Sequence, residues 1–135
     1  MSAPETDRAR ELFERIPYVR LLGLELVSAG GGEATVRLPH RPELTRHEGI
    51  MHGGALASLV DTASAFAVLS LLETGERTVT VDLTLHFLRP VLAGDTTARA
   101  RVLRAGRRLV TVSVEATDSV DKLVATALTT YARVS

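Results

Sequence analysis

The sequence of 135 residues contains no cysteine and no tryptophan, and only 4% of its residues are aromatic. The lack of cysteine excludes disulfides, thiolate metal sites and a cysteine nucleophile, and it fits a reducing compartment. Two tyrosines and three phenylalanines offer little surface on which nucleic-acid bases could stack. Sixteen basic and sixteen acidic residues give a formal net charge of zero, so the composition provides no strong positive field to attract a polyanion. We therefore expect no nucleic-acid partner.

Lysine is also nearly absent. Lys122 is the only one, which leaves fifteen arginines among the sixteen basic residues. Arginine binds phosphate and carboxylate groups through two parallel hydrogen bonds. A codon bias across the genome explains the same count, and this is the interpretation that we favour. The first residues carry neither the basic nor the apolar region of a secretory signal, so we expect a cytoplasmic protein.

No repeat, low-complexity tract or linker divides the chain. Its length and its 45% of hydrophobic residues are typical of one compact unit, so we expect a single domain over residues 1–135. The periodicity predicts a helix over 4–15, short strands over 24–28 and 33–38, and an irregular segment over 39–51. Tight turns separate four further strands, predicted over about 79–89, 94–104, 107–117 and 122–134.

The segment 53–72 differs in character, because Asp61 is its only charged residue. The run is long enough to suggest a membrane span, but its central aspartate and its many small and polar residues argue against one. A helix that is apolar on nearly all sides is typical of one buried in a protein core. We therefore predict an α+β fold in which one antiparallel sheet wraps around this helix.

Asp61 is the first candidate for chemistry. A lone carboxylate in an apolar helix is costly to desolvate unless it is paired, solvated in a pocket or protonated. Perturbed carboxylates of this kind gather at functional sites. The structural alternative is an aspartate that caps a loop or pairs with an arginine at an interface.

The second candidate is the run His52-Gly53-Gly54, which directly precedes the helix. Backbone N–H groups at a helix start point outward at the positive end of the dipole and can polarise a carbonyl, although a glycine pair there is often just a turn. Asp61 follows Gly53 by eight residues, about 12 Å along a helix axis. If both residues act on one carbonyl, a second chain must supply one of them.

The segment HGGALASLVDTASAFAV, followed by TVTVDLTLHFLRPVLAGD, resembles the hotdog-fold acyl-CoA thioesterases of the phenylacetate-degradation (PaaI-like) group. The resemblance covers roughly residues 18–133. It implies a hotdog fold with a six-stranded antiparallel sheet around one long helix. It also implies an acyl-CoA substrate, no metal or other cofactor, and a homodimer with sites at its interface, often paired into a homotetramer.

The resemblance assigns roles to individual residues. Gly53 would be the oxyanion glycine, and Asp61 of the partner chain would be the nucleophile or general base. His52 would help to position the thioester. Thr80 would orient the water or the carboxylate, although the alternating pattern of its strand places Thr80 on the face opposite Val79 and Val81.

The sequence departs from this family at Arg46, where similar enzymes usually have Asn or Gln. An amide can donate and accept, whereas a guanidinium only donates, so water positioning at this point is in question. Arg46 could bind the thioester oxygen or a CoA phosphate instead, or His47 or Glu48 could take over.

A basic patch for the CoA phosphates is a further expectation, with the solvated turn as the alternative. It consists of Arg104, Arg107 and Arg108 around one turn and Arg89 at the end of a neighbouring strand, and Gly54 is a further candidate for substrate contact. The sequence thus predicts an acyl-CoA thioesterase that uses Asp61. The alternative is a non-catalytic acyl-CoA-binding sensor on the same fold, and a hotdog dehydratase is disfavoured because its Asp/His dyad is absent.

Overall fold

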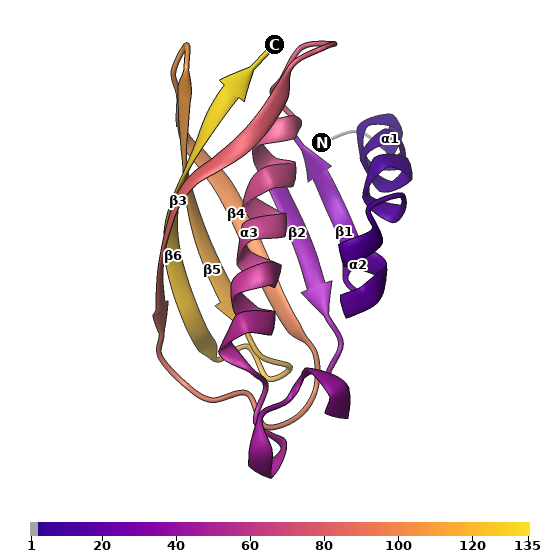
Figure 1. Ribbon diagram of the computed structural model, residues 1–135, viewed down its shortest axis with the longest axis vertical. Helices are drawn as coiled ribbons and strands as arrows, with labels where there is room; N and C mark the ends of the chain where they lie inside the picture. Colours follow the sequence, from indigo (N-terminus) through magenta and orange to yellow (C-terminus); the bar gives the residue numbers. More distant parts are fainter. Residues whose placement is uncertain (1–2) are drawn as a thin grey trace.

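The computed structural model describes residues 3–135 (Figure 1). Two helices, α1 (Ala3–Glu14) and α2 (Pro17–Leu22), precede the strands β1 (Glu25–Gly30) and β2 (Glu33–Leu38). Two short 3-10 turns, Pro42–Leu44 and His47–Gly49, lead into the long helix α3 (Gly53–Leu69). The remaining strands are β3 (Arg77–Phe87), β4 (Thr96–Ala105), β5 (Leu109–Thr117) and β6 (Leu123–Val134).

Across residues 3–135 the strands form one six-stranded sheet in the order β1-β2-β4-β5-β6-β3, and every neighbouring pair is antiparallel. The sheet curves around α3, while α1 and α2 lie beside β1 (Figure 1). The predicted α+β arrangement of a sheet wrapped around one long helix is therefore confirmed. β1 and β3 are its two edges.

The core lies between α3 and the concave face of the sheet. Leu59, Val60 and Ala63 of α3 are fully buried, as are Val36 of β2 and Val112 of β5. The small side chains of α3 allow the strands to approach its backbone closely. None of the helices in residues 3–135 is long and apolar enough to cross a membrane.

The helix α2 was not predicted from the sequence. Pro17 begins it at a position where the missing N–H of proline costs nothing. Gly23, with a φ of 74°, ends it in the left-handed conformation that glycine adopts readily. The structure also ends α3 at Leu69, so residues 70–72 of the predicted helix lie in a turn.

The predicted alternation along β3 is wrong in its first half. A β-bulge shifts the register against β6 between Thr80 and Asp82 and leaves Val81 unpaired. An extra residue reverses which side chains face the helix. Leu83 therefore packs against the core, whereas Val79 and Val81 are 54% and 56% exposed. The bulge turns Thr80 toward α3.

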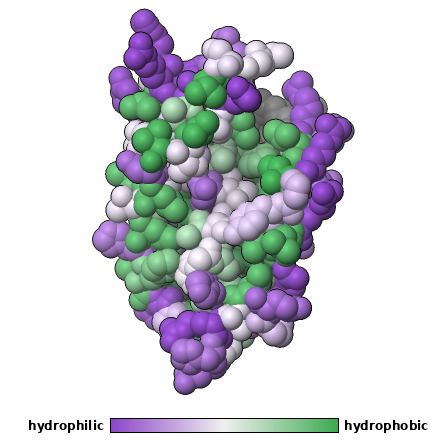
Figure 2. Space-filling view, viewed as in Figure 1, coloured by the Kyte–Doolittle hydropathy of each residue, from purple (hydrophilic) through white to green (hydrophobic). Residues whose placement is uncertain are grey.

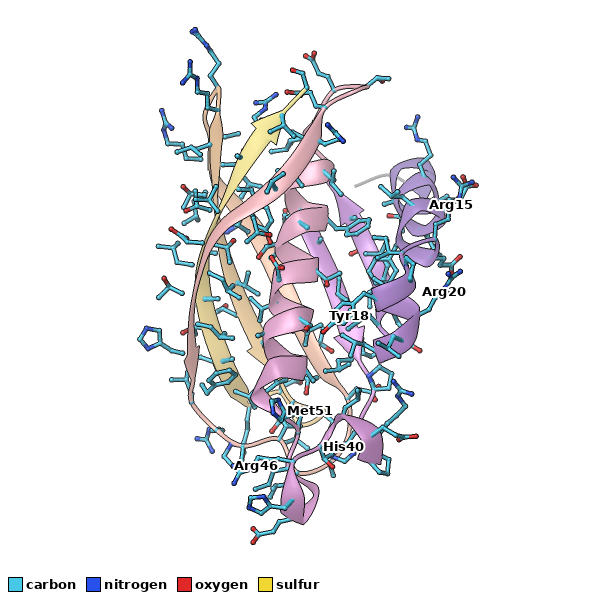
Figure 3. The ribbon with its side chains drawn as sticks, viewed as in Figure 1. Arg15, Tyr18, Arg20, His40, Arg46 and Met51 are labelled. Carbon is cyan, nitrogen blue, oxygen red and sulfur yellow. The ribbon has the colours of Figure 1, made fainter. Side chains whose placement is uncertain are left out.

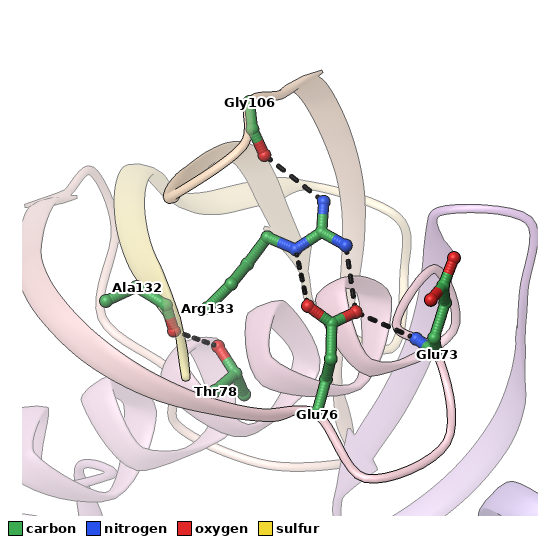
Figure 4. A network of polar contacts seen from close by, with 6 residues as sticks. All are labelled: Glu73, Glu76, Thr78, Gly106, Ala132 and Arg133. Carbon is green, nitrogen blue, oxygen red and sulfur yellow. Dashed lines mark hydrogen bonds and ion pairs between the residues drawn. The ribbon is translucent and has the colours of Figure 1, made fainter. Parts of the chain in front are cut away.

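An ion pair between Arg133 and Glu76 joins the end of β6 to the start of β3, and Arg133 also contacts the β4–β5 turn (Figure 4). Arg133 of β6 donates to both carboxylate oxygens of Glu76, just before β3, over 2.8 and 3.2 Å. Arg133 also donates to the carbonyl of Gly106 in the β4–β5 turn over 3.2 Å. The hydrogen bond from Arg133 holds the pKa of Glu76 below its ordinary value.

Candidate active site

Asp61 lies on the face of α3 that packs against β3 and β6, and its side chain is half-buried. The hydroxyl of Thr80 donates to Oδ1 of Asp61 over 3.0 Å. The hydroxyl of Tyr131 shares its one proton between the same Oδ1 and the backbone carbonyl of Asp61, which lies 2.7 Å away. The bulge in β3 makes the first of these contacts possible, because it directs Thr80, which remains exposed, toward α3.

Tyr131 was not predicted from the sequence. It is 1% exposed and lies directly opposite Thr80 in the register of β3 and β6. Burial, reinforced by the hydrogen bond to Asp61, raises the pKa of Tyr131 well above its ordinary value, so its hydroxyl keeps its proton and remains a donor. Its cross-strand position depends on a register that one strand's sequence does not reveal.

The start of α3 presents a backbone N–H group. His52 caps the helix, and its Nδ1 accepts from the N–H of Gly54 over 2.7 Å. This bond occupies the Gly54 amide that could otherwise have contacted a substrate. The N–H of Gly53 has no acceptor among residues 3–135, as expected for the first turn of a helix. Gly53 therefore keeps the free donor that an oxyanion site requires.

A cavity of about 340 Å³ opens beside Gly53. Arg46 and Arg89 contribute its charged groups. The ring of Phe87 lies so close that a Cβ on Gly53 would be 3.3 Å from it. Apolar residues form the rest of the lining: Ile50, Met51, Leu56, Leu88, Pro90 and Val91.

Arg46 lies on the segment that precedes α3, near the start of the helix (Figure 3), and His47 begins the second 3-10 turn of that segment. Both side chains are exposed, and a guanidinium nitrogen of Arg46 lies 3.4 Å from Nε2 of His47. The segment is held by a bridge between Thr45 and Met51. Arg46 thus faces the same cavity as the free N–H of Gly53, whereas His47 does not line it.

Asp61 does not line this cavity, and one chain keeps it apart from Gly53. Both residues lie on the single helix α3, separated by about 12 Å along its axis. Gly53 lies against Phe87, while Asp61 is bonded to Thr80, seven residues earlier in β3. Across the bulge, the stretch from Thr80 to Phe87 spans six residue steps of β6, so these two places along β3 are about 20 Å apart. The two groups cannot reach one carbonyl within one chain.

The four predicted patch arginines do not form one patch within a chain. Arg104, Arg107 and Arg108 flank the β4–β5 turn, and the carbonyl of Arg108 accepts from the N–H of Arg133 near the end of β6. Arg89 follows the opposite end of β3, where Phe87 pairs with Ala125. Within one chain, Arg89 therefore lies apart from the other three arginines and lines the cavity beside Gly53.

Comparisons with known proteins agree on one family. Residues 48–125 match the family described as the thioesterase superfamily. The acyl-coenzyme A thioesterase PaaI of Escherichia coli is 33% identical over 126 residues, which cover 93% of this chain and 88% of that protein. Human acyl-coenzyme A thioesterase 13 is 36% identical over 111 residues, which cover 80% of this chain and 79% of that protein.

Solved structures agree as well. The Escherichia coli PaaI protein matches with a TM-score of 0.87 at 30% identity, covering 96% of this chain and 92% of that one. A conserved protein of Pseudomonas aeruginosa matches with a TM-score of 0.88 at 40% identity, covering 93% of this chain and 99% of that one.

Proposed function

Because this chain belongs to the thioesterase superfamily, and is a hotdog-fold acyl-CoA thioesterase of the PaaI-like group, we propose that it uses Asp61 and Gly53 to hydrolyse its substrate. The products are a carboxylic acid and free CoA, and the acyl group is of an aliphatic or aryl-acetyl type. One observation carries the proposal: the only charged residue of α3 is a carboxylate held by two hydroxyl donors.

We propose further that each site is shared between two chains of a homodimer. β3 is an edge of the sheet, so one side of its backbone has no partner strand within residues 3–135. Antiparallel pairing of two β3 edges about a dyad near mid-strand would set the end of one strand against the first half of the other. Gly53, beside Phe87 at that end, would then approach the partner's Asp61, beside the partner's Thr80.

The surface of β3 supports this association. Val79 and Val81 are exposed, and Phe87 and Leu88 at the end of the strand are 53% and 52% exposed. Figure 2 shows apolar side chains gathered among polar ones on the face where α3 and β3 lie. Exposed apolar clusters and unpaired strand edges are typical of protein interfaces. Pairing of two such dimers into a homotetramer is the further expectation.

The chemistry follows from these positions. The N–H of Gly53 would donate to the thioester oxygen and stabilise the negative charge that develops on it. Asp61 would either attack the carbonyl carbon and form an anhydride that water then cleaves, or take a proton from the water that attacks. In both routes the C–S bond breaks, and CoA leaves as the thiol after protonation.

The remaining predicted residues take supporting roles in this proposal. Thr80 orients Asp61, and His52 fixes the start of the helix that presents Gly53. Arg46 would donate to the thioester oxygen or to a CoA phosphate. The arginines of the β4–β5 turn would contact the CoA phosphates, and on pairing of the β3 edges they would approach the partner's Arg89.

A panel of acyl-CoAs assayed for release of free thiol tests the proposal, with Asp61→Asn and Asp61→Ala beside the wild type. We expect the wild type to release CoA and both variants to lose most of the rate while still forming dimers in light scattering. Equal rates in the wild type and in Asp61→Ala would overturn the role of Asp61. Saturable acyl-CoA binding without any turnover would indicate a sensor, and a monomer would exclude the shared site.

A further inference from the structure

We propose that Tyr131 is a positioning residue for Asp61: together with Thr80 it fixes Oδ1, so that Oδ2 is the oxygen that acts on the substrate or its water. This inference rests on the proposed function, since it assigns the reacting atom of the same carboxylate. The inference adds Tyr131 to that mechanism, and it specifies which of the two carboxylate oxygens of Asp61 reacts.

The hydrogen bonds distinguish the two oxygens. Oδ1 accepts from the hydroxyls of both Thr80 and Tyr131, whereas Oδ2 accepts from no group in residues 3–135. Two donors on one oxygen restrict rotation about the Cβ–Cγ bond of Asp61. They also draw electron density toward Oδ1, which leaves Oδ2 as the oxygen whose lone pairs are free.

The two donors come from adjacent strands and form a single support. Thr80 and Tyr131 are directly opposite each other in β3 and β6, and the bulge lies immediately after Thr80. Without that extra residue, Thr80 and Leu83 could not both face the helix. The bulge therefore places a second donor beside Tyr131 while the rest of β3 keeps its apolar contacts with the core.

Tyr131 is suited to hold a carboxylate through a catalytic cycle. Its hydroxyl also donates to the backbone carbonyl of Asp61 over 2.7 Å, so it fixes the side chain and the helix backbone at one point. The phenol is buried, and its raised pKa keeps it protonated even in the alkaline range. Because the phenol stays protonated, it remains a hydrogen-bond donor to Asp61 and does not take up the proton that Asp61 removes from water.

A double-mutant cycle between Tyr131 and Asp61 tests the proposal. Tyr131→Phe removes the hydroxyl and keeps the ring, and we expect kcat to fall about 10- to 100-fold with KM changed by less than about threefold. In an Asp61→Asn background the same change should lower the residual rate no further, because a residue that acts through Asp61 has nothing left to position. Tyr18→Phe is the matched control, since it deletes the other tyrosine hydroxyl, which is exposed and bonded to Ser58.

The outcomes separate this inference from the function on which it rests. Full activity of Tyr131→Phe, or an equal loss in the wild-type and Asp61→Asn backgrounds, would overturn the positioning role while the role of Asp61 stands. An active Asp61→Asn variant, or a wild type without turnover, would overturn the proposed mechanism and this inference with it. Thermal unfolding of each variant shows whether a lost rate reflects a lost fold.

A second measurement requires no substitution at Tyr131. A buried hydroxyl bonded to a carboxylate should give a slowly exchanging, downfield proton signal in the NMR spectrum. Asp61→Asn should shift this signal upfield, because a neutral amide oxygen is a weaker acceptor than a carboxylate. A signal unchanged by Asp61→Asn, or one absent from the wild type, would overturn the contact between the two residues.

Discussion

Gly53 occupies the first position of α3 and directly follows His52, whose backbone is extended with a φ of −66° and a ψ of 136°. The first helical position is the one at which proline is favoured, because its missing N–H would have no partner within the helix. The residue before a proline is restricted to an extended conformation, which His52 already has. The chain therefore permits a substitution that deletes the N–H of Gly53 without disturbing the helix.

Gly53→Pro should lower kcat by about 10²- to 10³-fold, the usual loss on removal of one oxyanion donor. Gly53→Ala is the matched control, because it adds a Cβ at the same place, 3.3 Å from the ring of Phe87, but keeps the N–H. We expect it to stay within a few-fold of the wild type. Steady-state kinetics with an acyl-CoA and circular dichroism of both variants provide the measurement. Equal loss in both would assign the effect to Phe87 rather than to the N–H.

Mixing two inactive variants tests whether the site is shared. In a heterodimer of Gly53→Pro and Asp61→Asn chains, one site combines both defects and the other combines two wild-type groups. After subunit exchange of an equal mixture, about half of the dimers are heterodimers, so activity should recover to about a quarter of the wild-type value. Free-thiol release before and after exchange measures this recovery. No recovery, in a mixture shown to contain heterodimers, would contradict a site built from two chains.

The sequence predicted the features of this site that depend on a single helix. It did not predict those that depend on the pairing of strands far apart in the chain. The spacing of Gly53 and Asp61 depends only on helix geometry, so their separation on one helix could be calculated in advance. The direction of Thr80 could not, since a bulge is a property of two strands and β6 lies some fifty residues further on. Tyr131 was missed for the same reason.

The position of Arg89 and the helix α2 were also not predicted from the sequence. Arg89 follows the last residue of β3. The end of the sheet at which it lies depends on the strand order β5-β6-β3. A local pattern carries no information on that order. The helix α2 has six residues, fewer than two turns, and too few positions to show a helical period. Both outcomes reflect how little of the packing one stretch of sequence contains.

Arg46 can be assigned with a truncated substrate. Arg46→Ala should lower kcat/KM for an acyl-CoA. An acyl-pantetheine thioester lacks the nucleotide phosphates of CoA. If the guanidinium contacts the thioester oxygen, the same loss in kcat/KM should be seen with this shorter substrate. The position of Arg46 in the cavity beside Gly53 favours this result. A loss confined to the full acyl-CoA would assign Arg46 to a phosphate instead. Arg46→Gln, which keeps a donor, is the companion variant and should retain more of the rate than Arg46→Ala.

Tyr131 should also govern the stability of the protein in alkali. Its pKa is raised above the ordinary value of 10.0, chiefly by burial, so the folded protein holds a proton that the unfolded chain releases. This contribution to the free energy of unfolding is complete below about pH 10 and is lost as the pH rises above it. Thermal unfolding followed from about pH 8 to 11 should therefore show a steep decline in the wild type.

Tyr131→Phe lacks this proton and should show a flatter alkaline decline, even if its unfolding temperature at neutral pH is lower. The sequence makes the comparison clean, because lysine and tyrosine are the side chains that ordinarily titrate near pH 10, and the chain has only one lysine and two tyrosines. Tyr18→Phe, which removes the exposed tyrosine, should keep the steep wild-type slope. If the slope flattens in Tyr18→Phe and persists in Tyr131→Phe, the buried phenol is not the group that makes the fold sensitive to alkali.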